Sequence, residues 1–451
     1  MTMKKLTIDT AFDLRLQGAP SADVETLEKP KSVALIPSSI PFIKPKLSVK
    51  EGDKVQIGTP LFVHKHDDRI QFLSPGSGVV EAIQYGPKRR LDAVVICLDE
   101  QETQVSFDKI TQTTLETTDR ETLIGLLLKG GLWSSFREFP FKKIPNPETS
   151  CPSIYVTLDN DEPFHPEASV YLDGRIDQFK FGLDILKKLS KKVHVCSSTQ
   201  NKYVQQKIAS NLTHRVSGNY PANQAGTILY TDKTKASENG AWTISAQELI
   251  RLADLLQTGC YPIERVVVAA GSSAKVRKHY TTRVGVPIQT VLKGQTEFDH
   301  PVRVVAGGVY TGRATDVTGY LGSEDFAVHI LPNSIESEFM SFVMPGADKP
   351  SYSRAFVSTL FRTKKWAHTT AINGGERSCI ACTKCADVCP VDIQPQFLMK
   401  TLEAGDVEDG MALGLLDCVT CGLCTYVCPS KIDLDHIFTT NRASLEQEAR
   451  S

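Results

Sequence analysis

The chain has 451 residues, of which 41% are hydrophobic and 23% charged, a composition typical of a soluble globular protein of about three or four domains. Lys and Arg number 51 against 52 Asp and Glu, so no excess charge points to nucleic acid or to an anionic membrane surface. Eight of the 12 cysteines fall in two short runs near the C-terminus, which fits a reducing compartment better than a secreted disulfide scaffold.

Neither a secretory signal nor a membrane span is predicted. Residues 1–18 carry charged side chains from Lys4 to Arg15 and contain no apolar core of the kind that a signal peptide needs. The most apolar run, 123–133, is interrupted by Lys129 and is shorter than the roughly 20 residues that cross a bilayer. We therefore expect any membrane association to depend on a partner.

After a lead-in over residues 1–31, residues 32–100 show the pattern of short strands separated by turns. Apolar residues alternate, and Gly52, Gly58 and the run 75–78 have turn composition. Segments 49–61 and 74–83 are similar to the two halves of a biotinyl/lipoyl-type barrel-sandwich. The hairpin tip at 64–68 lacks the usual surroundings of a modified lysine, so we interpret the domain as structural. A prosthetic arm on Lys65, or metal binding by the tip histidines, is the less favoured alternative.

Alternating strands and helices follow, and we assign residues 101–295 to one Rossmann-like α/β domain. The pattern predicts helices at 121–133, 175–192 and 244–259 and strands at 153–159, 193–198 and 265–276. Such alternation indicates a mostly parallel sheet. Neither the turn at 270–273 nor the one at 129–133 matches the G-x-G-x-x-G pattern that lets backbone amides approach a phosphate, so the sequence favours ordinary fold turns there.

Two modules complete the predicted architecture, a multidomain α+β fold. Short strands broken by glycines over 301–335 indicate a β-grasp module of the soluble-ligand-binding (SLBB) type, assigned to 296–340. Residues 336–375 read as polar and helical. Helical segments at 394–405 and 408–417 join the two cysteine runs, so residues 341–451 are assigned to an α-helical ferredoxin domain.

The two cysteine runs share the frame C-x-x-C-x-x-C-x-x-x-C-P. They comprise Cys379, Cys382, Cys385 and Cys389, and Cys418, Cys421, Cys424 and Cys428. Thiolates at this spacing hold three corners of an iron–sulfur cube, and in two-cluster ferredoxins the remote fourth cysteine ligates the other cluster. We therefore predict two [4Fe–4S] clusters, one held by Cys379, Cys382, Cys385 and Cys428 and the other by Cys418, Cys421, Cys424 and Cys389. Structural zinc or disulfides would leave the doubled frame unexplained.

From end to end, the order of domains resembles the NqrA family, the A subunit of the sodium-translocating NADH:quinone reductase, and its relative, the C subunit of the Rnf ferredoxin:NAD oxidoreductase. The segments that carry the resemblance are 18–20, 49–60, 74–78, 88–90, 131–137 with 140–141, 344–346 and 424–429. The Rnf subunit is expected to bind NADH and flavin through a glycine-rich loop, which here corresponds to 130–140. Trp133, Phe136 and Arg137 replace its glycines and would block a phosphate, which favours the quinone reductase relative and implies no flavin in this chain. The segment 160–163 still resembles the acidic element of the flavin-binding relatives.

Retention of all eight cysteines favours the Rnf relative instead. Many quinone reductase subunits have lost most of these cysteines, whereas the Rnf subunit keeps them. We interpret the chain as a quinone reductase subunit that has kept its ferredoxin domain.

The resemblance implies a subunit of a membrane NADH:ubiquinone reductase that transports Na⁺, peripheral on the cytoplasmic face of the bacterial inner membrane. It implies membrane-embedded and flavin-bearing partner subunits, a contribution to quinone binding, and electron transfer through the clusters with no catalytic side chain in this chain. The sequence assigns no quinone-contacting residue. We expect an apolar shell around the clusters, formed by Ile380, Val388, Val419, Leu423, Tyr426 and Val427. The alternatives are an Rnf-type C subunit and a non-redox assembly subunit.

Overall fold

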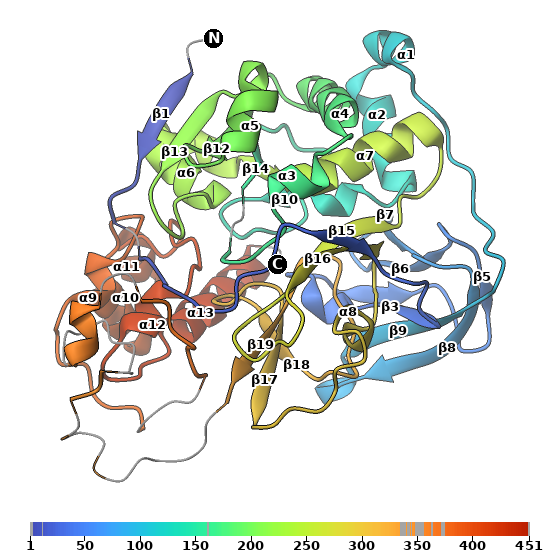
Figure 1. Ribbon diagram of the computed structural model, residues 1–451. Helices are drawn as coiled ribbons and strands as arrows, with labels where there is room; N and C mark the ends of the chain where they lie inside the picture. The colour runs from blue at the N-terminus through green and yellow to red at the C-terminus, as the bar shows by residue number, and fades with distance from the viewer. Residues whose placement is uncertain are drawn as a thin grey trace.

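The computed structural model describes residues 3–10, 12–159, 162–333, 340, 343, 345–347, 356–361, 364–370 and 375–449. The named strands form two six-stranded sheets, one four-stranded sheet and one three-stranded sheet. The C-terminal helices gather at one end of the molecule, beside β1 and α6 (Figure 1).

Residues 32–98 form a sandwich of two antiparallel sheets with the orders β3-β9-β8-β5 and β4-β6-β7. Its elements are β3 (Ser32–Leu35), η1 (Pro37–Ser39), β4 (Pro45–Leu47), β5 (Lys54–Val55), β6 (Pro60–His64), β7 (Asp67–Leu73), β8 (Gly78–Tyr85), η2 (Pro87–Arg89) and β9 (Leu91–Leu98). Phe62 and Phe72, paired across β6 and β7, stack with ring centroids 4.7 Å apart in the core. The predicted barrel-sandwich is confirmed, and Lys65 lies at the exposed tip of the β6–β7 hairpin.

The α/β layer contains a six-stranded sheet with the order β1-β13-β12-β11-β14-β10, parallel except for β10. Its strands are β1 (Lys4–Thr7), β10 (Arg137–Glu138), β11 (Ile154–Thr157), β12 (Val193–Ser198), β13 (His214–Ser217) and β14 (Trp242–Ser245). Its helices are α1 (Gln112–Thr117), α2 (Arg120–Lys129), η3 (Trp133–Ser135), α3 (Ala168–Tyr171), α4 (Ile176–Leu189), α5 (Lys202–Lys207), η4 (Ala209–Asn211), α6 (Ala225–Asp232), η5 (Ala236–Gly240) and α7 (Ala246–Thr258). The N-terminal lead-in thus supplies the edge strand β1.

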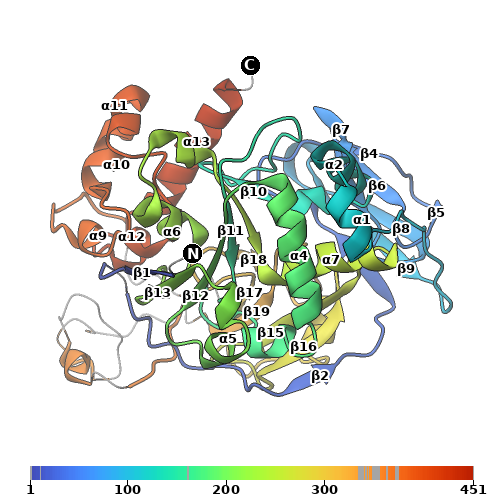
Figure 2. The same ribbon diagram turned by 90° about the horizontal axis from the view of Figure 1, so that it is seen from above.

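Helices cover both faces of this sheet. Figure 2 shows α4 and α6 on opposite sides of β11. On one face α4 and α7 pack on the inward residues Ile154 and Val156, and on the other face α6 packs on Tyr155 and Cys196. Both faces of β11 are therefore buried, as expected for a strand inside a parallel sheet.

The second six-stranded sheet has the order β18-β17-β19-β15-β16-β2. Its elements are β2 (Val24–Thr26), β15 (Glu264–Ala270), β16 (Lys278–Arg283), α8 (Ile288–Val291), β17 (Val302–Ala306), β18 (Arg313–Thr315) and β19 (Ala327–Pro332). β15 and β16 fall in the range that the sequence grouped with the α/β layer, and they pair here with β19 and β2. An apolar strand pattern does not specify which sheet a strand joins. The division of the chain into domains stays a prediction.

The C-terminal region is helical, as predicted, and comprises α9 (Lys384–Asp387), α10 (Pro395–Glu403), α11 (Val407–Ala412), α12 (Leu423–Val427) and α13 (Leu434–Glu448), preceded by η7 (Val357–Leu360). The expectation of helix is wrong for residues 364–370, which form no helix: Trp366 pairs with Leu16 in a β-bridge, and the Thr370 amide donates to the Pro332 carbonyl. Within the stretch 336–375, the following lie outside the described residues: 336–339, 341, 342, 344, 348–355, 362, 363 and 371–374; Met344 also belongs to the 344–346 segment.

Candidate functional site

The eight cysteines gather around two small cavities in the C-terminal region. Cys379, Cys382, Cys385 and Cys428 line one of them. Cys389, Cys418, Cys421 and Cys424 line the other. Each cavity thus receives three cysteines from one run and the fourth from the other run. These are the two groups of four that the repeated frame predicts as ligand sets, and the ligation itself stays a prediction.

The backbone repeats the same conformation in the two runs. Ala381 and Thr420, each two residues after the first cysteine, have φ of 51° and 54°. Thr383 and Gly422, each four residues after it, have φ of 60° and 73°, and each directly precedes a short helix, α9 or α12. Residues other than glycine rarely adopt positive φ, so these positions mark a constrained turn that wraps each set of thiols around its cavity.

The thiols are poorly exposed, and this affects their chemistry. Cys385 and Cys421 are buried and the other six are partly buried. Burial raises the pKa of Cys389 to about 11, and it also raises the pKa of Cys418 and Cys424. Because metal-bound cysteine is deprotonated, buried thiols of this kind need a compensating positive charge. Four such donors around each cavity fit a [4Fe–4S] cluster, whose usual ligand set is four cysteines.

The predicted apolar shell is correct for four residues and wrong for two. Val388, Val419, Leu423 and Val427 are buried in the core of the C-terminal region. Ile380 is 68% exposed and Tyr426 is 39% exposed, so neither is a buried wall residue, although Ile380 lines the rim of its cavity. An isolated frame of cysteines does not reveal which intervening side chains point outward.

The second cysteine run faces the α/β layer. Lys142 donates from Nζ to the carbonyl of Val419 over 3.0 Å, and the hydroxyl of Tyr220 donates to the carbonyl of Cys421 over 2.7 Å. Arg442 on α13 donates to the carbonyl of Leu415 over 2.7 Å and also to that of Pro140. These bonds fix one of the two cysteine cavities against the rest of the protein.

A larger cleft of about 520 Å³ lies between the barrel-sandwich, the α/β layer and the SLBB sheet. Thr157 and Asp159 at the carboxyl end of β11, and Ser245 at that of β14, contribute to its lining. The carboxyl edge of a parallel sheet is where α/β proteins usually bind ligands. Sequence reasoning did not find this cleft, because its walls come from segments that are far apart in the chain.

The loop at 130–140, predicted to be blocked by large side chains, forms one wall of the cleft. Trp133 and Phe136 are buried, with their ring centroids 5.4 Å apart, and both pack against Trp242. Arg137 is buried, lines the cleft and pairs with Glu324 of the SLBB module. Trp133, Phe136 and Arg137 are the three side chains that the sequence comparison with the Rnf loop placed at glycine positions, and the absence of a phosphate site there stays a prediction.

Glu162 is a buried carboxyl in the cleft wall and belongs to the acidic segment 160–163; Asn160 and Asp161 lie outside the described residues. It accepts from the Tyr310 amide over 3.1 Å, from the Thr311 hydroxyl over 2.8 Å, and lies 3.0 Å from the Tyr220 hydroxyl. Burial, which outweighs these bonds, raises the pKa of Glu162 to about 7. No local signal could have identified its partners, because they lie 58 to 149 residues away.

Comparison with known proteins identifies the parts of the chain one by one. Residues 6–99 match the NqrA N-terminal barrel-sandwich hybrid domain, 118–261 the NqrA second alpha/beta domain, 266–316 the NQRA C-terminal domain and 378–432 a 4Fe-4S dicluster domain. The fold and the cysteine cavities therefore define a protein of the NqrA type that carries a dicluster ferredoxin domain.

Relatives match over nearly the whole chain. The A subunit of the Na(+)-translocating NADH-quinone reductase of Pseudomonas aeruginosa strain PAO1 is 32% identical over 98% of this chain and 100% of its own length. The corresponding subunit of Vibrio alginolyticus is 33% identical over 91% of this chain and 92% of its own. The chain belongs to the NqrA family, the A subunits of Na⁺-translocating NADH-quinone reductases, which confirms the resemblance seen in the sequence.

Solved structures also match part of the chain. A crystal structure of NAD⁺-reducing [NiFe]-hydrogenase in the air-oxidized state has a TM-score of 0.34 and 12% identity, over 51% of this chain and 52% of that one. Among the described residues, no helix combines the length and the apolar character needed to cross a bilayer.

Proposed function

We propose that this chain is the NqrA component of a sodium-translocating NADH:quinone reductase in which electrons pass through two [4Fe–4S] clusters. The observation that carries the proposal is the grouping of the eight cysteines into two sets of four, within a chain that matches NqrA proteins over nearly its whole length. Cys379, Cys382, Cys385 and Cys428 would hold one cluster, and Cys418, Cys421, Cys424 and Cys389 the other. Such clusters, when bound, supply one-electron transfer.

The protein's own contribution is to set the surroundings of the clusters. Val388, Val419, Leu423 and Val427 keep water away from the thiolates, and apolar surroundings and hydrogen bonds to sulfur tune a cluster's potential. Lys142 and Arg442 place two positive charges near Cys418. The set that contains Cys418 therefore lies against the α/β layer, with these two positive charges nearby.

The test is spectroscopy of the chain purified without oxygen. We expect iron and labile sulfide for two clusters, and EPR signals on reduction with dithionite but not with NADH and added flavin. Cys382→Ser and Cys421→Ser should each remove one signal, while Cys97→Ser, outside both runs, should change neither. Absence of iron and sulfide from the anaerobic protein would refute the proposal, and signals with NADH would favour an Rnf-type role instead.

A non-redox assembly role is the second candidate, and one observation favours it. Seven of the eight cysteines, all except Cys382, lie in or against the hydrophobic core of the C-terminal region, so the clusters would hold that core together. In the assembled complex, Cys421→Ser separates the two roles. Loss of electron flow with the chain still bound supports the redox role, whereas normal activity in the complex that remains supports the structural one.

We further propose that the 520 Å³ cleft contributes to quinone binding. Ile36, Phe62 and Phe72 give it apolar walls, and Arg137 with Glu162 supplies polar groups, a combination that suits a ring with two carbonyl oxygens. Lys142 lines the cleft and also bonds to the second cysteine run, so one side chain connects the proposed quinone site with a proposed cluster site.

Ser38, partly exposed in the wall of the cleft, offers a test. Ser38→Trp should fill the space, and Ser38→Ala is the matched control. In the assembled complex we expect the tryptophan variant to lose labelling by a photoreactive ubiquinone analogue within this chain, with the control unchanged. Equal labelling in both variants would refute the proposal that the cleft contributes to quinone binding.

The partners follow from the same proposal. Because the described residues contain no helix able to cross a bilayer, we propose that the chain docks on membrane-embedded subunits at the cytoplasmic face, with a flavin-bearing subunit oxidising NADH. Flotation with membrane vesicles should require those membrane subunits. Binding to protein-free vesicles would contradict this arrangement.

A further inference from the structure

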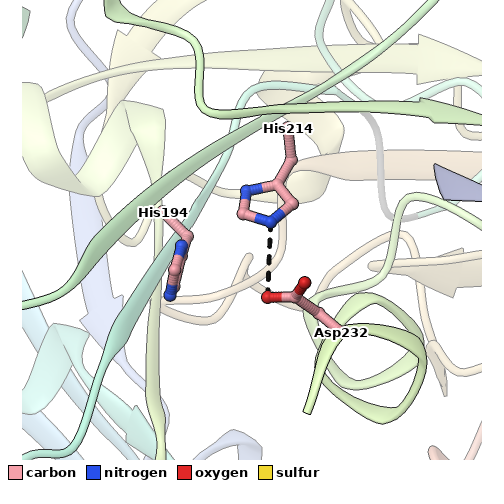
Figure 3. Close-up of side chains that lie close together, drawn as sticks. All are labelled: His194, His214 and Asp232. Carbon is pink, nitrogen blue, oxygen red and sulfur yellow. Dashed lines mark ion pairs between the residues drawn. The ribbon is translucent and has the colours of Figure 1, made fainter. Parts of the chain in front are cut away.

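A cluster of metal-ligand side chains lies on the α6 face of the parallel sheet. His194 on β12, His214 on β13 and Asp232 at the end of α6 each present one ligand atom, and these atoms all lie within 4.8 Å of one another. Figure 3 shows the two imidazole rings and the carboxylate converging from the two strands and the helix. The three residues are separated by 18 or more positions in sequence, so only the fold brings them together.

The register of the sheet explains the convergence. His214 pairs with Cys196 across β12 and β13, which makes His194 its diagonal neighbour on the same face. The two rings lie at 79° with their centroids 4.9 Å apart. The cluster lies where β12 and β13 begin, whereas the cleft lies at the carboxyl ends of β11 and β14, so the two sites are separate.

The hydrogen bonds around His214 aim a ring nitrogen at the carboxylate. Thr213 Oγ1 lies 2.8 Å from His214 Nδ1. The same oxygen accepts a hydrogen bond from the Val195 amide over 2.8 Å, and its hydroxyl donates to the Val195 carbonyl over 3.2 Å. With its hydroxyl hydrogen on that carbonyl, Thr213 accepts a hydrogen bond from Nδ1–H. The Nε2 lone pair then faces Asp232 Oδ2 at 3.3 Å, an arrangement that a cation between the two atoms stabilises.

His194 is suited to be a ligand for a different reason. Among the described residues its ring makes no hydrogen bond, although Tyr155 and His214 pack against it. A neutral imidazole has a lone pair on one ring nitrogen, and in His194 no hydrogen-bond partner among the described residues occupies it, so that nitrogen is available for a metal ion.

Asp232 is held in place by groups that leave one oxygen directed at the histidines. Lys4 on β1 pairs with Oδ1, and the Tyr155 hydroxyl donates to Oδ2 over 3.1 Å. Metal-ligating carboxylates are commonly oriented by such outer hydrogen bonds.

We propose that His194, His214 and Asp232 form a binding site for a divalent transition-metal ion of the imidazole-preferring class, with Zn²⁺ as the best match and water in the fourth position. The ion would fasten the end of α6 to the sheet. The opposite side of α6 contacts the cysteine region, where Gly226 packs against Val419, and the next residue after the helix, Lys233, pairs with Asp417. Metal binding would thus stabilise the surface on which the ferredoxin domain rests.

The experiment uses the full chain with both sets of cysteines loaded with iron and sulfide, so that the thiols are occupied. Titration with Co²⁺ without oxygen should show one equivalent bound, with d–d bands but without thiolate-to-cobalt charge transfer. His194→Gln, at a position with no hydrogen bond to lose among the described residues, should abolish binding. Tyr155→Phe should weaken it by about ten- to a hundred-fold through loss of the outer bond.

His66→Gln is the matched control, since His66 also lies next to another histidine, with ring centroids 5.6 Å apart. It should bind cobalt like the unmodified chain. Unchanged iron and sulfide in all variants shows that each has folded. Equal cobalt binding in His194→Gln and the unmodified chain, no binding beyond the clusters, or a spectrum dominated by thiolate charge transfer would each overturn the proposal.

Discussion

Replacing Glu162 by glutamine is expected to make the protein more stable above neutral pH. Tyr220 has a single hydroxyl hydrogen, and its oxygen lies 2.7 Å from the Cys421 carbonyl and 3.0 Å from Glu162 Oε1. When that hydrogen is donated to Cys421, Oε1 must carry a proton of its own to bond to Tyr220. Burial disfavours the charged form more than the bonds from Tyr310, Thr311 and Tyr220 favour it, so the pKa of the carboxyl is raised.

The magnitude follows from the pKa in the folded protein, about 7, and the ordinary value of 4.5. Between these pH values the folded chain holds a proton that the unfolded chain has released, so the free energy of unfolding falls as pH rises. The loss is complete above about pH 7 and amounts to about 3 kcal/mol. Glutamine carries no such loss, because its carbonyl accepts from the Tyr310 amide and its NH₂ group donates to Tyr220 and Thr311.

The assay is chemical denaturation of the anaerobic holoprotein at pH 5 and pH 8.5, with the variant compared to the unmodified chain at each pH. Glu162→Gln should be close to neutral at pH 5 and more stable by up to about 3 kcal/mol at pH 8.5. Glu81→Gln, at an exposed strand position, should show no such difference. A Glu162→Gln variant that is equally or more destabilised at pH 8.5 would refute the assignment of a neutral carboxyl.

Three further substitutions test the packing between the modules. Phe136→Ala removes a fully buried ring from the loop at 130–140. Thermal or urea unfolding should show that the free energy of unfolding falls by about 3–5 kcal/mol. A fall below about 1 kcal/mol would mean that the loop is not packed. Gly18→Ala should lower the yield of folded protein. Gly18 has a φ of 99°, and a Cβ there would lie 2.2 Å from the carbonyl carbon of Gly271. A normal yield would contradict this close approach. Arg283→Met breaks a bidentate pair at 2.9 Å with Glu102, which is partly buried and keeps Lys29 and the Ser77 amide as partners. We expect a loss of about 1–3 kcal/mol at pH 7 that shrinks when Glu102 is also replaced by Gln. An equal loss in the double variant would show that the charge pair is not the cause.

Local patterns in the sequence were enough for most elements and for the cysteine chemistry. The helix at 244–259 forms as α7 because its apolar side chains recur at helical spacing, and Gly259 ends it with a left-handed φ of 68°. The repeated cysteine frame predicted two groups of four thiols because three ligands and their turn lie within seven residues. By contrast, residues 364–370 do not form the helix that the sequence predicts, because Trp366 pairs with Leu16, a contact that no local pattern encodes.

The sequence by itself therefore determined the order of the modules, the family and the two cysteine sets, since each depends on short-range spacing or on similarity along the chain. Only the tertiary structure decided where β15 and β16 pair, how Glu162 meets Tyr220 and Thr311, and that His194, His214 and Asp232 converge. Those arrangements depend on sheet register and on helix placement over distant segments. A one-residue change in register would turn His214 to the other face of the sheet, so its role depends on strand pairing rather than on its neighbours in the chain.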